Sequence, residues 1–170
     1  MADLKNELVE RIRSVVSGSP LGNEPRPINL HEPEIDELEK KYVLECLDST
    51  FVSSVGAFIP QLEQRIQDIT GAKHAIAVSN GTVGLQVALF LAGVEYGDEV
   101  IVPAFTWVAT ANVVLYCGAT PVFIDVDPQT YNLDVAQITA KVTDRTRAVI
   151  AVHLFGRCVD MDALRAGLPA

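Results

Sequence analysis

The chain has 170 residues, of which 49% are hydrophobic and 21% charged, as in ordinary soluble globular proteins. A formal net charge of −9 argues against nucleic acid or an anionic membrane as a main partner. The three cysteines, Cys46, Cys117 and Cys158, lie too far apart for a C-x-x-C motif, and the first residues contain no apolar signal core. We therefore expect a cytoplasmic protein with no nucleic-acid or membrane partner.

Residues 1–29 are predicted to form an N-terminal helix and a linker. Apolar residues recur at helical spacing from Leu4 to Val15, and the stretch "SGSPLGNEPRP" that follows is rich in Gly and Pro. The simplest interpretation is a helix that docks on the body of the protein or on a partner subunit. Residues 30–170 then form the second part of the chain.

Two further helices are predicted before the pattern changes. Apolar residues at helical spacing favour an amphipathic helix over residues 34–47, which the stretch "STFVSSVG" interrupts. The next segment, "AFIPQLEQRIQDITG", predicts a third helix that ends at Gly71.

After Gly71 the pattern alternates between apolar strands and helices. Such alternation indicates an α/β fold with a mainly parallel sheet and helices on both faces, and ligands bind at the carboxyl ends of its strands. The predicted strands cover residues 74–79, 98–103, 120–126 and 147–153, and the predicted helices cover residues 82–93, 106–117 and 135–142.

The turn "SNGT", residues 79–82, joins the first predicted strand to its helix. A helix start presents free backbone N–H groups and the positive end of a dipole, so this turn is a possible anion site. Gly81 lets an anion approach the backbone, and Asn80 and Thr82 can add hydrogen bonds. An ordinary helix N-cap explains the same residue types. A dinucleotide site is disfavoured because no G-x-G-x-x-G lies here.

Other polar and aromatic residues follow the later strands. Trp107, the only tryptophan, can stack on a planar ligand held near Gly81, although a partly buried aromatic at a helix start is the simpler interpretation. We interpret His153 as a structural group at the end of a strand. Asp125 and Asp127 are interpreted as residues that stabilise a loop. Composition and spacing alone thus predict an anion-binding α/β domain.

Several blocks in order resemble the DegT/StrS family of PLP-dependent sugar aminotransferases. They are "AVSNGTVGLQVAL", "GDEVIVPAFTWVATANVVLYCGATPVFIDVD", "NLD" and "AVHLFGRCVDMDAL", and the match runs from about Leu30 to Leu164. The resemblance implies that residues 30–170 are the N-terminal portion of a PLP-binding large domain of the aspartate-aminotransferase type, truncated before the small C-terminal domain. It also implies a homodimer with shared active sites.

The same resemblance implies roles for individual residues. Gly81 and Thr82, with Asn80 beside them, would bind the phosphate of pyridoxal 5′-phosphate (PLP), and Trp107 would stack on its ring. Ser53 and Ser54 in "VSSVG" would contact the substrate. At Val83-Gly84 the chain departs from the family, which usually has two small residues such as Ala-Ala.

The implied reaction moves an amino group, with glutamate as the expected donor, to a 4-keto-6-deoxy nucleotide sugar for glycan biosynthesis. The closest subgroup in pattern aminates UDP-linked sugars such as those leading to legionaminic acid or bacillosamine. None of the five lysines matches the family's Schiff-base lysine, which the resemblance places beyond Ala170. The chain alone is therefore expected to be inactive. A non-catalytic fragment that only binds phosphate or a partner chain, and a PLP-dependent sugar dehydratase of the same family, remain as alternatives.

Overall fold

The computed structural model describes Glu10 and residues 33–168. The chain divides into two compact units, Met1–Phe58 and Ile59–Ala170. Apart from Glu10, the helix and linker predicted over residues 1–29 lie outside the described residues. None of the helices in the described residues has both the length and the apolar character needed to cross a membrane.

Helix α2, Glu37–Asp48, begins at a capping box. The carboxylate of Asp36 accepts a hydrogen bond from the backbone N–H of Leu38 (2.7 Å), and the carboxylate of Glu39 accepts one from the N–H of Asp36 (2.9 Å). The bond from Leu38 also lowers the pKa of Asp36. The helix predicted over residues 34–47 is confirmed, with a later start.

Helix α3, Phe58–Thr70, confirms the third predicted helix. It ends at Gly71, whose φ of 71° lies in the left-handed region that glycine tolerates. The N–H of Gly71 donates to the carbonyl of Gln67 at 2.8 Å, which closes the last turn.

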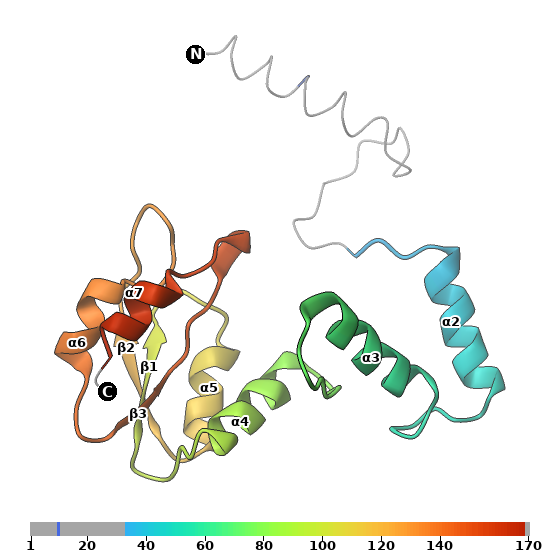
Figure 1. Ribbon diagram of the computed structural model, residues 1–170, viewed down its shortest axis with the longest axis horizontal. Helices are drawn as coiled ribbons and strands as arrows, with labels where there is room; N and C mark the ends of the chain where they lie inside the picture. The colour runs from blue at the N-terminus through green and yellow to red at the C-terminus, as the bar shows by residue number, and fades with distance from the viewer. Residues whose placement is uncertain (1–9, 11–32, 169–170) are drawn as a thin grey trace. The chain divides into compact units, whose positions relative to one another are not determined.

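Three parallel strands form the sheet of the second unit, in the order β2-β1-β3. The strands are β1, Glu99–Pro103, β2, Thr120–Ile124, and β3, Thr146–Val149. All of β1 is buried, because strands flank it on both edges and side chains cover both of its faces. The predicted parallel α/β sheet is confirmed in these strands (Figure 1).

Each face of the sheet has its own core, because successive side chains of a strand point to opposite faces. Val100 and Val102 of β1 belong to one core and Ile101 to the other. The first core also contains Leu89, Val94, Val113, Val114, Ala119 and Ile150, and the second contains Ile124, Leu133, Ile138 and Leu164.

Helices cover the two faces of the sheet in Figure 1. Helices α4, Gly81–Leu91, and α5, Ala109–Tyr116, supply the first core. Helices α6, Ile138–Lys141, and α7, Met161–Ala166, supply the second. The predicted covering of both faces is therefore confirmed.

Several predicted elements are shorter in the structure. The helix predicted over residues 106–117 covers only Ala109–Tyr116, and the strand predicted over residues 120–126 ends at Ile124. The helix predicted over residues 135–142 is a 3₁₀ turn, η1, Val135–Gln137, followed by the single α-turn of α6. Asp134 caps it as expected, since its carboxylate accepts a hydrogen bond from the N–H of Ala136 at 3.0 Å. Strand β3 ends at Val149 rather than at residue 153, because its pairing with β1 stops there.

The strand predicted over residues 74–79 is wrong for this structure. The segment pairs with no strand of the described residues, and the Ile76 side chain is 82% exposed. The backbone N–H of Ala77, in the same segment, donates instead to a carboxylate oxygen of Glu63 at 2.9 Å. An apolar run becomes a strand only where a neighbouring strand completes its hydrogen bonds, and the three-stranded sheet supplies none here.

Candidate functional site

Helix α4 begins directly after the "SNGT" turn. Asn80 is its N-cap, and the side-chain oxygen of Asn80 accepts a hydrogen bond from the N–H of Val83 at 3.0 Å. Within the described residues, the N–H groups of Gly81 and Thr82 and the hydroxyl of Thr82 make no hydrogen bond. The helix therefore starts with unused donors beside the positive end of its dipole.

Glycine at position 81 keeps the space in front of these donors open. A Cβ atom added to Gly81 would meet no atom within 4 Å, so a side chain here would project into free volume. Its backbone is not left-handed, which means that the turn does not require glycine for conformational reasons. The open volume and the free donors together fit a phosphate-sized anion.

Gly84 has a different function in the same helix. A Cβ atom at this position would lie 3.3 Å from a methyl group of Val78, so glycine allows α4 to pack closely on the segment that precedes it. The departure from the family pattern at Val83-Gly84 thus leaves the start of α4 intact.

Trp107 lies in the loop between β1 and α5. Its side chain is 79% exposed, and its carbonyl accepts the N–H of Thr110 at 3.0 Å. The hydroxyls of Thr106 and the buried Thr110 lie 3.1 Å apart and brace the same loop. The interpretation of Trp107 as a partly buried aromatic at a helix start is therefore wrong, and the indole is available to a ligand. No hydrogen bond or ring contact of the described residues joins Trp107 to the turn at Asn80–Thr82.

Ser53 and Ser54 lie in a tight loop of the first unit. The hydroxyl of Ser53 accepts a hydrogen bond from the N–H of Val55 at 3.4 Å, whereas that of Ser54 makes none within the described residues. A Cβ atom at Gly56 would lie 2.7 Å from the carbonyl oxygen of Phe51, so the loop requires glycine there. A role for these serines in substrate binding stays a prediction.

The remaining polar residues named in the sequence have structural partners. The ring nitrogen Nδ1 of His153 accepts the N–H of Val159 at 3.1 Å. The carboxylate of Asp127 accepts the N–H groups of Gln129 and Thr130, both at 2.8 Å. These two bonds lower the pKa of Asp127, the one from Thr130 most.

Sequence reasoning missed the contacts between the loops at the carboxyl ends of the strands. Asn132, which is 5% exposed, ties the loop after β2 to the loop after β3. Its side chain accepts the N–H of Leu154 and donates to the carbonyl of Arg157, both at 3.1 Å. The motif "NLD" belongs to the blocks that carry the family resemblance, and nothing in its composition shows that its asparagine is buried.

No group of three or more His, Cys, Asp or Glu side chains in the part of the chain that the structure describes is placed to hold a metal ion. The contacts of Asp125 and Asp127 are to backbone N–H groups of their own loop. The carboxylate of Asp125 accepts the N–H of Val126 at 2.8 Å.

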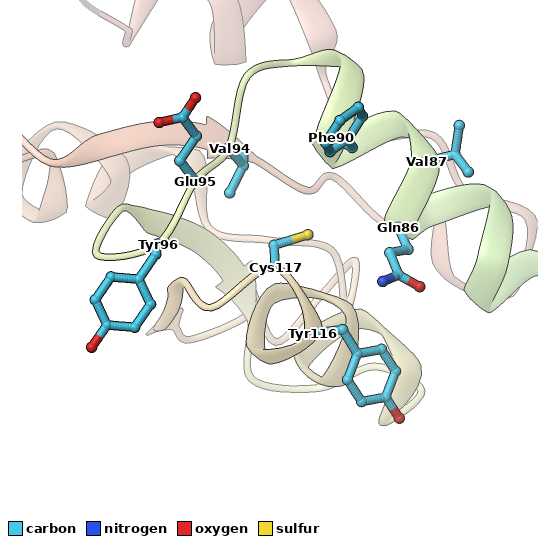
Figure 2. Close-up of a pocket in the computed structure, with 8 residues that line it drawn as sticks. All are labelled: Gln86, Val87, Phe90, Val94, Glu95, Tyr96, Tyr116 and Cys117. Atoms are coloured by element: carbon cyan, nitrogen blue, oxygen red, sulfur yellow. The ribbon is translucent and has the colours of Figure 1, made fainter.

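A hollow of about 480 Å³ lies elsewhere in the second unit, between the C-terminal half of α4 and the end of α5. Figure 2 shows Cys117 near its middle, with the rings of Tyr96 and Tyr116 pointing away from each other. Its only charged lining residue is Glu95, which disfavours a phosphate there. The hollow is lined by Gln86, Val87, Phe90, Val94, Glu95, Tyr96, Tyr116 and Cys117.

The fold is that of the PLP-dependent aminotransferases. An aminotransferase from Psychrobacter cryohalolentis superposes with a TM-score of 0.77 at 38% identity, over 83% of this chain and 36% of that one. A GDP-4-keto-6-deoxymannose-3-dehydratase, crystallised with PLP and glutamate trapped together, superposes with a TM-score of 0.74 at 28% identity, over 83% of this chain and 38% of that one.

The chain belongs to the DegT/DnrJ/EryC1/StrS aminotransferase family, whose model matches residues 33–167. GDP-perosamine synthase from Caulobacter vibrioides is 52% identical to it over 137 residues, which are 81% of this chain and 37% of that protein. The resemblance to this family is thereby confirmed. The chain spans little more than a third of the length of such relatives.

Proposed function

We propose that the chain supplies the phosphate-binding part of a PLP-dependent sugar-nucleotide aminotransferase. The reaction would transfer an amino group from glutamate to the 4-keto carbon of a 4-keto-6-deoxy nucleotide sugar, as a step in glycan biosynthesis. The observation that supports this most is the start of α4, where free donors face open volume in a chain of this family.

Three residues of the turn would hold the phosphate of PLP. Gly81 and Thr82 would donate their backbone N–H groups, and Thr82 would add its hydroxyl. Asn80 would keep the first turn of α4 in place through its bond to Val83. The helix dipole favours the negative charge of the phosphate at this position.

Trp107 would cover the ring of PLP. Its exposed indole offers a flat face, which favours offset stacking on a planar ring. When bound, PLP supplies an electron sink for bond-breaking at the amino-bearing carbon. The residues of this chain position that ring and hold its phosphate, while Ser53 and Ser54 would contact the sugar nucleotide.

The donor and the nucleotide are inferred from relatives. The dehydratase structure with PLP and glutamate supports glutamate as the donor. GDP-perosamine synthase supports a nucleotide-linked sugar as the acceptor of the amino group. GDP is therefore a candidate nucleotide, as is the UDP used by the subgroup that the sequence resembles. A homodimer is part of the same proposal.

A sugar dehydratase is the second candidate function, since one structural relative has that activity. Both functions need the same phosphate site, so the experiment below tests what they share. The 170-residue chain by itself is expected to transfer no amino group, because none of its five lysines matches the family's catalytic position.

The experiment compares pyridoxamine 5′-phosphate with pyridoxamine, neither of which can react with lysines because both lack the aldehyde. The phosphorylated compound should bind the chain and quench the fluorescence of Trp107, the only indole. Thr82→Ala should weaken its binding by about 1.5–3 kcal/mol, the contribution of a hydrogen bond to a charged group. Thr82→Ser keeps the hydroxyl and serves as the matched control.

Pyridoxamine itself should bind weakly and equally to both variants, because it carries no phosphate. Equal affinity of the phosphorylated compound for wild type and Thr82→Ala would contradict the assignment of the turn. Full Trp107 fluorescence in the bound state would place the ring elsewhere.

A further inference from the structure

Three aromatic side chains gather where the strands of the sheet end. Phe105 follows β1, Tyr131 follows β2 and Phe155 follows β3, and we call these residues the aromatic trio. Their ring centroids lie 6.0, 6.1 and 6.3 Å apart, within the range of edge-to-face and tilted ring contacts. Each ring is about half exposed or more, Phe155 at 67%.

Hydrogen bonds between two loops hold two members of the trio, Tyr131 and Phe155, in place. The amide of Asn132 bonds to the backbone of Leu154 and Arg157 on either side of Phe155. The guanidinium of Arg157 donates to the carbonyl of Gln129, in the loop that carries Tyr131, at 2.8 Å. The loops of Tyr131 and Phe155 are therefore fastened at two points, and their rings are displayed from a rigid base.

The backbone beneath two of the rings is strained. Tyr131 has a φ of 59° and Phe155 a φ of 50°, in the left-handed region that bulky residues seldom adopt. Asn or Gly would adopt this backbone more easily, so large aromatic residues carry a cost here. Such strain is concentrated at functional sites, where the surrounding structure maintains it.

We propose that the aromatic trio is a stacking surface for the nucleobase of a nucleotide-linked substrate. The proposal rests on the proposed function, because it assigns a site to one part of that substrate. A nucleobase is the planar, weakly hydrated part of a sugar nucleotide, and exposed aromatic faces bind it largely irrespective of base identity. The location agrees, since ligands of parallel sheets bind at the carboxyl ends of the strands.

The charge beside the trio also suits a nucleotide. Arg157 is exposed, and its guanidinium is fixed next to the loop of Tyr131 by the bond to Gln129. The ionised carboxylate of Asp127 lies near Arg157 and accepts two backbone N–H groups. A diphosphate attached to a base on the trio would meet a guanidinium of which one N–H group is used within the described residues, by the carbonyl of Gln129.

The test measures the binding of GDP, UDP and pyrophosphate to the chain and to two matched variants. Phe155→Leu removes a ring of the trio but keeps an apolar side chain. Phe90→Leu makes the same change at a 76% exposed ring on α4, which lines the hollow beside residues that precede β1 and β2 and not the carboxyl ends of the strands. Phe155→Leu should weaken GDP and UDP roughly tenfold, on the scale of one base stacked on one ring, and should leave pyrophosphate unchanged.

Three outcomes would overturn the proposal. Nucleotides could bind wild type and Phe155→Leu equally, or Phe90→Leu could weaken them as much. Phe155→Leu could instead change the sedimentation of the chain without changing nucleotide affinity, which would make the trio a contact between protein chains. Wild type, Phe155→Leu and Phe90→Leu should bind pyridoxamine 5′-phosphate equally. This measurement therefore tests the phosphate site independently of the nucleobase site.

Discussion

The two ends of β1 differ in the surroundings of their side chains, which are buried and paired at the amino end and exposed to solvent at the carboxyl end. At its amino end the carboxylate of Glu99 is only 8% exposed. It accepts the hydroxyl of Thr143 at 2.6 Å and pairs with the guanidinium of Arg145. At its carboxyl end, Phe105 and Trp107 present their rings to solvent. Polar groups at the amino end are paired within the chain, whereas the carboxyl end offers surface that nothing in the described residues covers.

This difference predicts which residues stabilise the fold and which are available to bind a ligand. Groups that are buried and paired stabilise the fold, and their loss leaves a partner without its bond. Exposed rings and free helix donors contribute little to the fold, so they are available to a ligand. Substitutions at the two ends should therefore differ in what they change.

The largest effect is expected at the amino end. Glu99→Ala should lower the free energy of unfolding by about 1–3 kcal/mol, because Thr143 and Arg145 lose a buried charged acceptor. Urea denaturation followed by circular dichroism measures the change. Glu95→Ala, at an exposed position in the preceding turn, is the control and should be close to neutral. An equal loss of stability in the two variants would show that the burial and pairing of Glu99 do not stabilise the fold.

A smaller change in stability is expected at the carboxyl end. Trp107→Ala should alter the free energy of unfolding by no more than about 0.5 kcal/mol, because its side chain is 79% exposed. The same variant should bind pyridoxamine 5′-phosphate more weakly. A loss of stability as large as that of Glu99→Ala would show that the indole supports the fold rather than a ligand.

The smallest effect concerns Asp127, and it depends on pH. Hydrogen bonds from Thr130 and Gln129 lower the pKa of this carboxylate below its ordinary value of 3.8. Its contribution to stability is therefore present above pH 3.8 and is lost as the pH falls through the lowered pKa. The stability of wild type and Asp127→Asn should converge below that pH.

Asp144→Asn, at another exposed carboxylate, provides the comparison for Asp127. A stability difference between wild type and Asp127→Asn that stayed constant from neutral to strongly acidic pH would show that the carboxylate does not act through its charge.

How far the sequence could predict these features depends on the range of the interactions. The apolar strand at β1 and the N-cap at Asn80 follow from residues adjacent in the chain, and both are present. The segment over residues 74–79 has the composition of a strand, but pairing requires a partner that composition does not reveal. Its apolar residues predicted burial, and Ile76 is instead 82% exposed.

The carboxyl-end loops were less predictable for a related reason. Asn132 bonds to residues 22 and 25 positions away, and no local pattern indicates such a contact. The left-handed backbone at Tyr131 and Phe155 is disfavoured by their own side chains, so only the packed loops account for it. The resemblance predicted Gly81, Thr82 and Trp107 as ligand contacts, and that prediction awaits a direct measurement.

That measurement is an amide nuclear magnetic resonance titration of the isotope-labelled chain with pyridoxamine 5′-phosphate. A phosphate bound at the start of α4 would accept hydrogen bonds from the N–H groups of Gly81 and Thr82, which have no other partner within the described residues. Their two signals should shift downfield and saturate together, while the amide of Glu95 beside the hollow stays in place. Saturating binding with the signals of Gly81 and Thr82 unmoved would contradict the account.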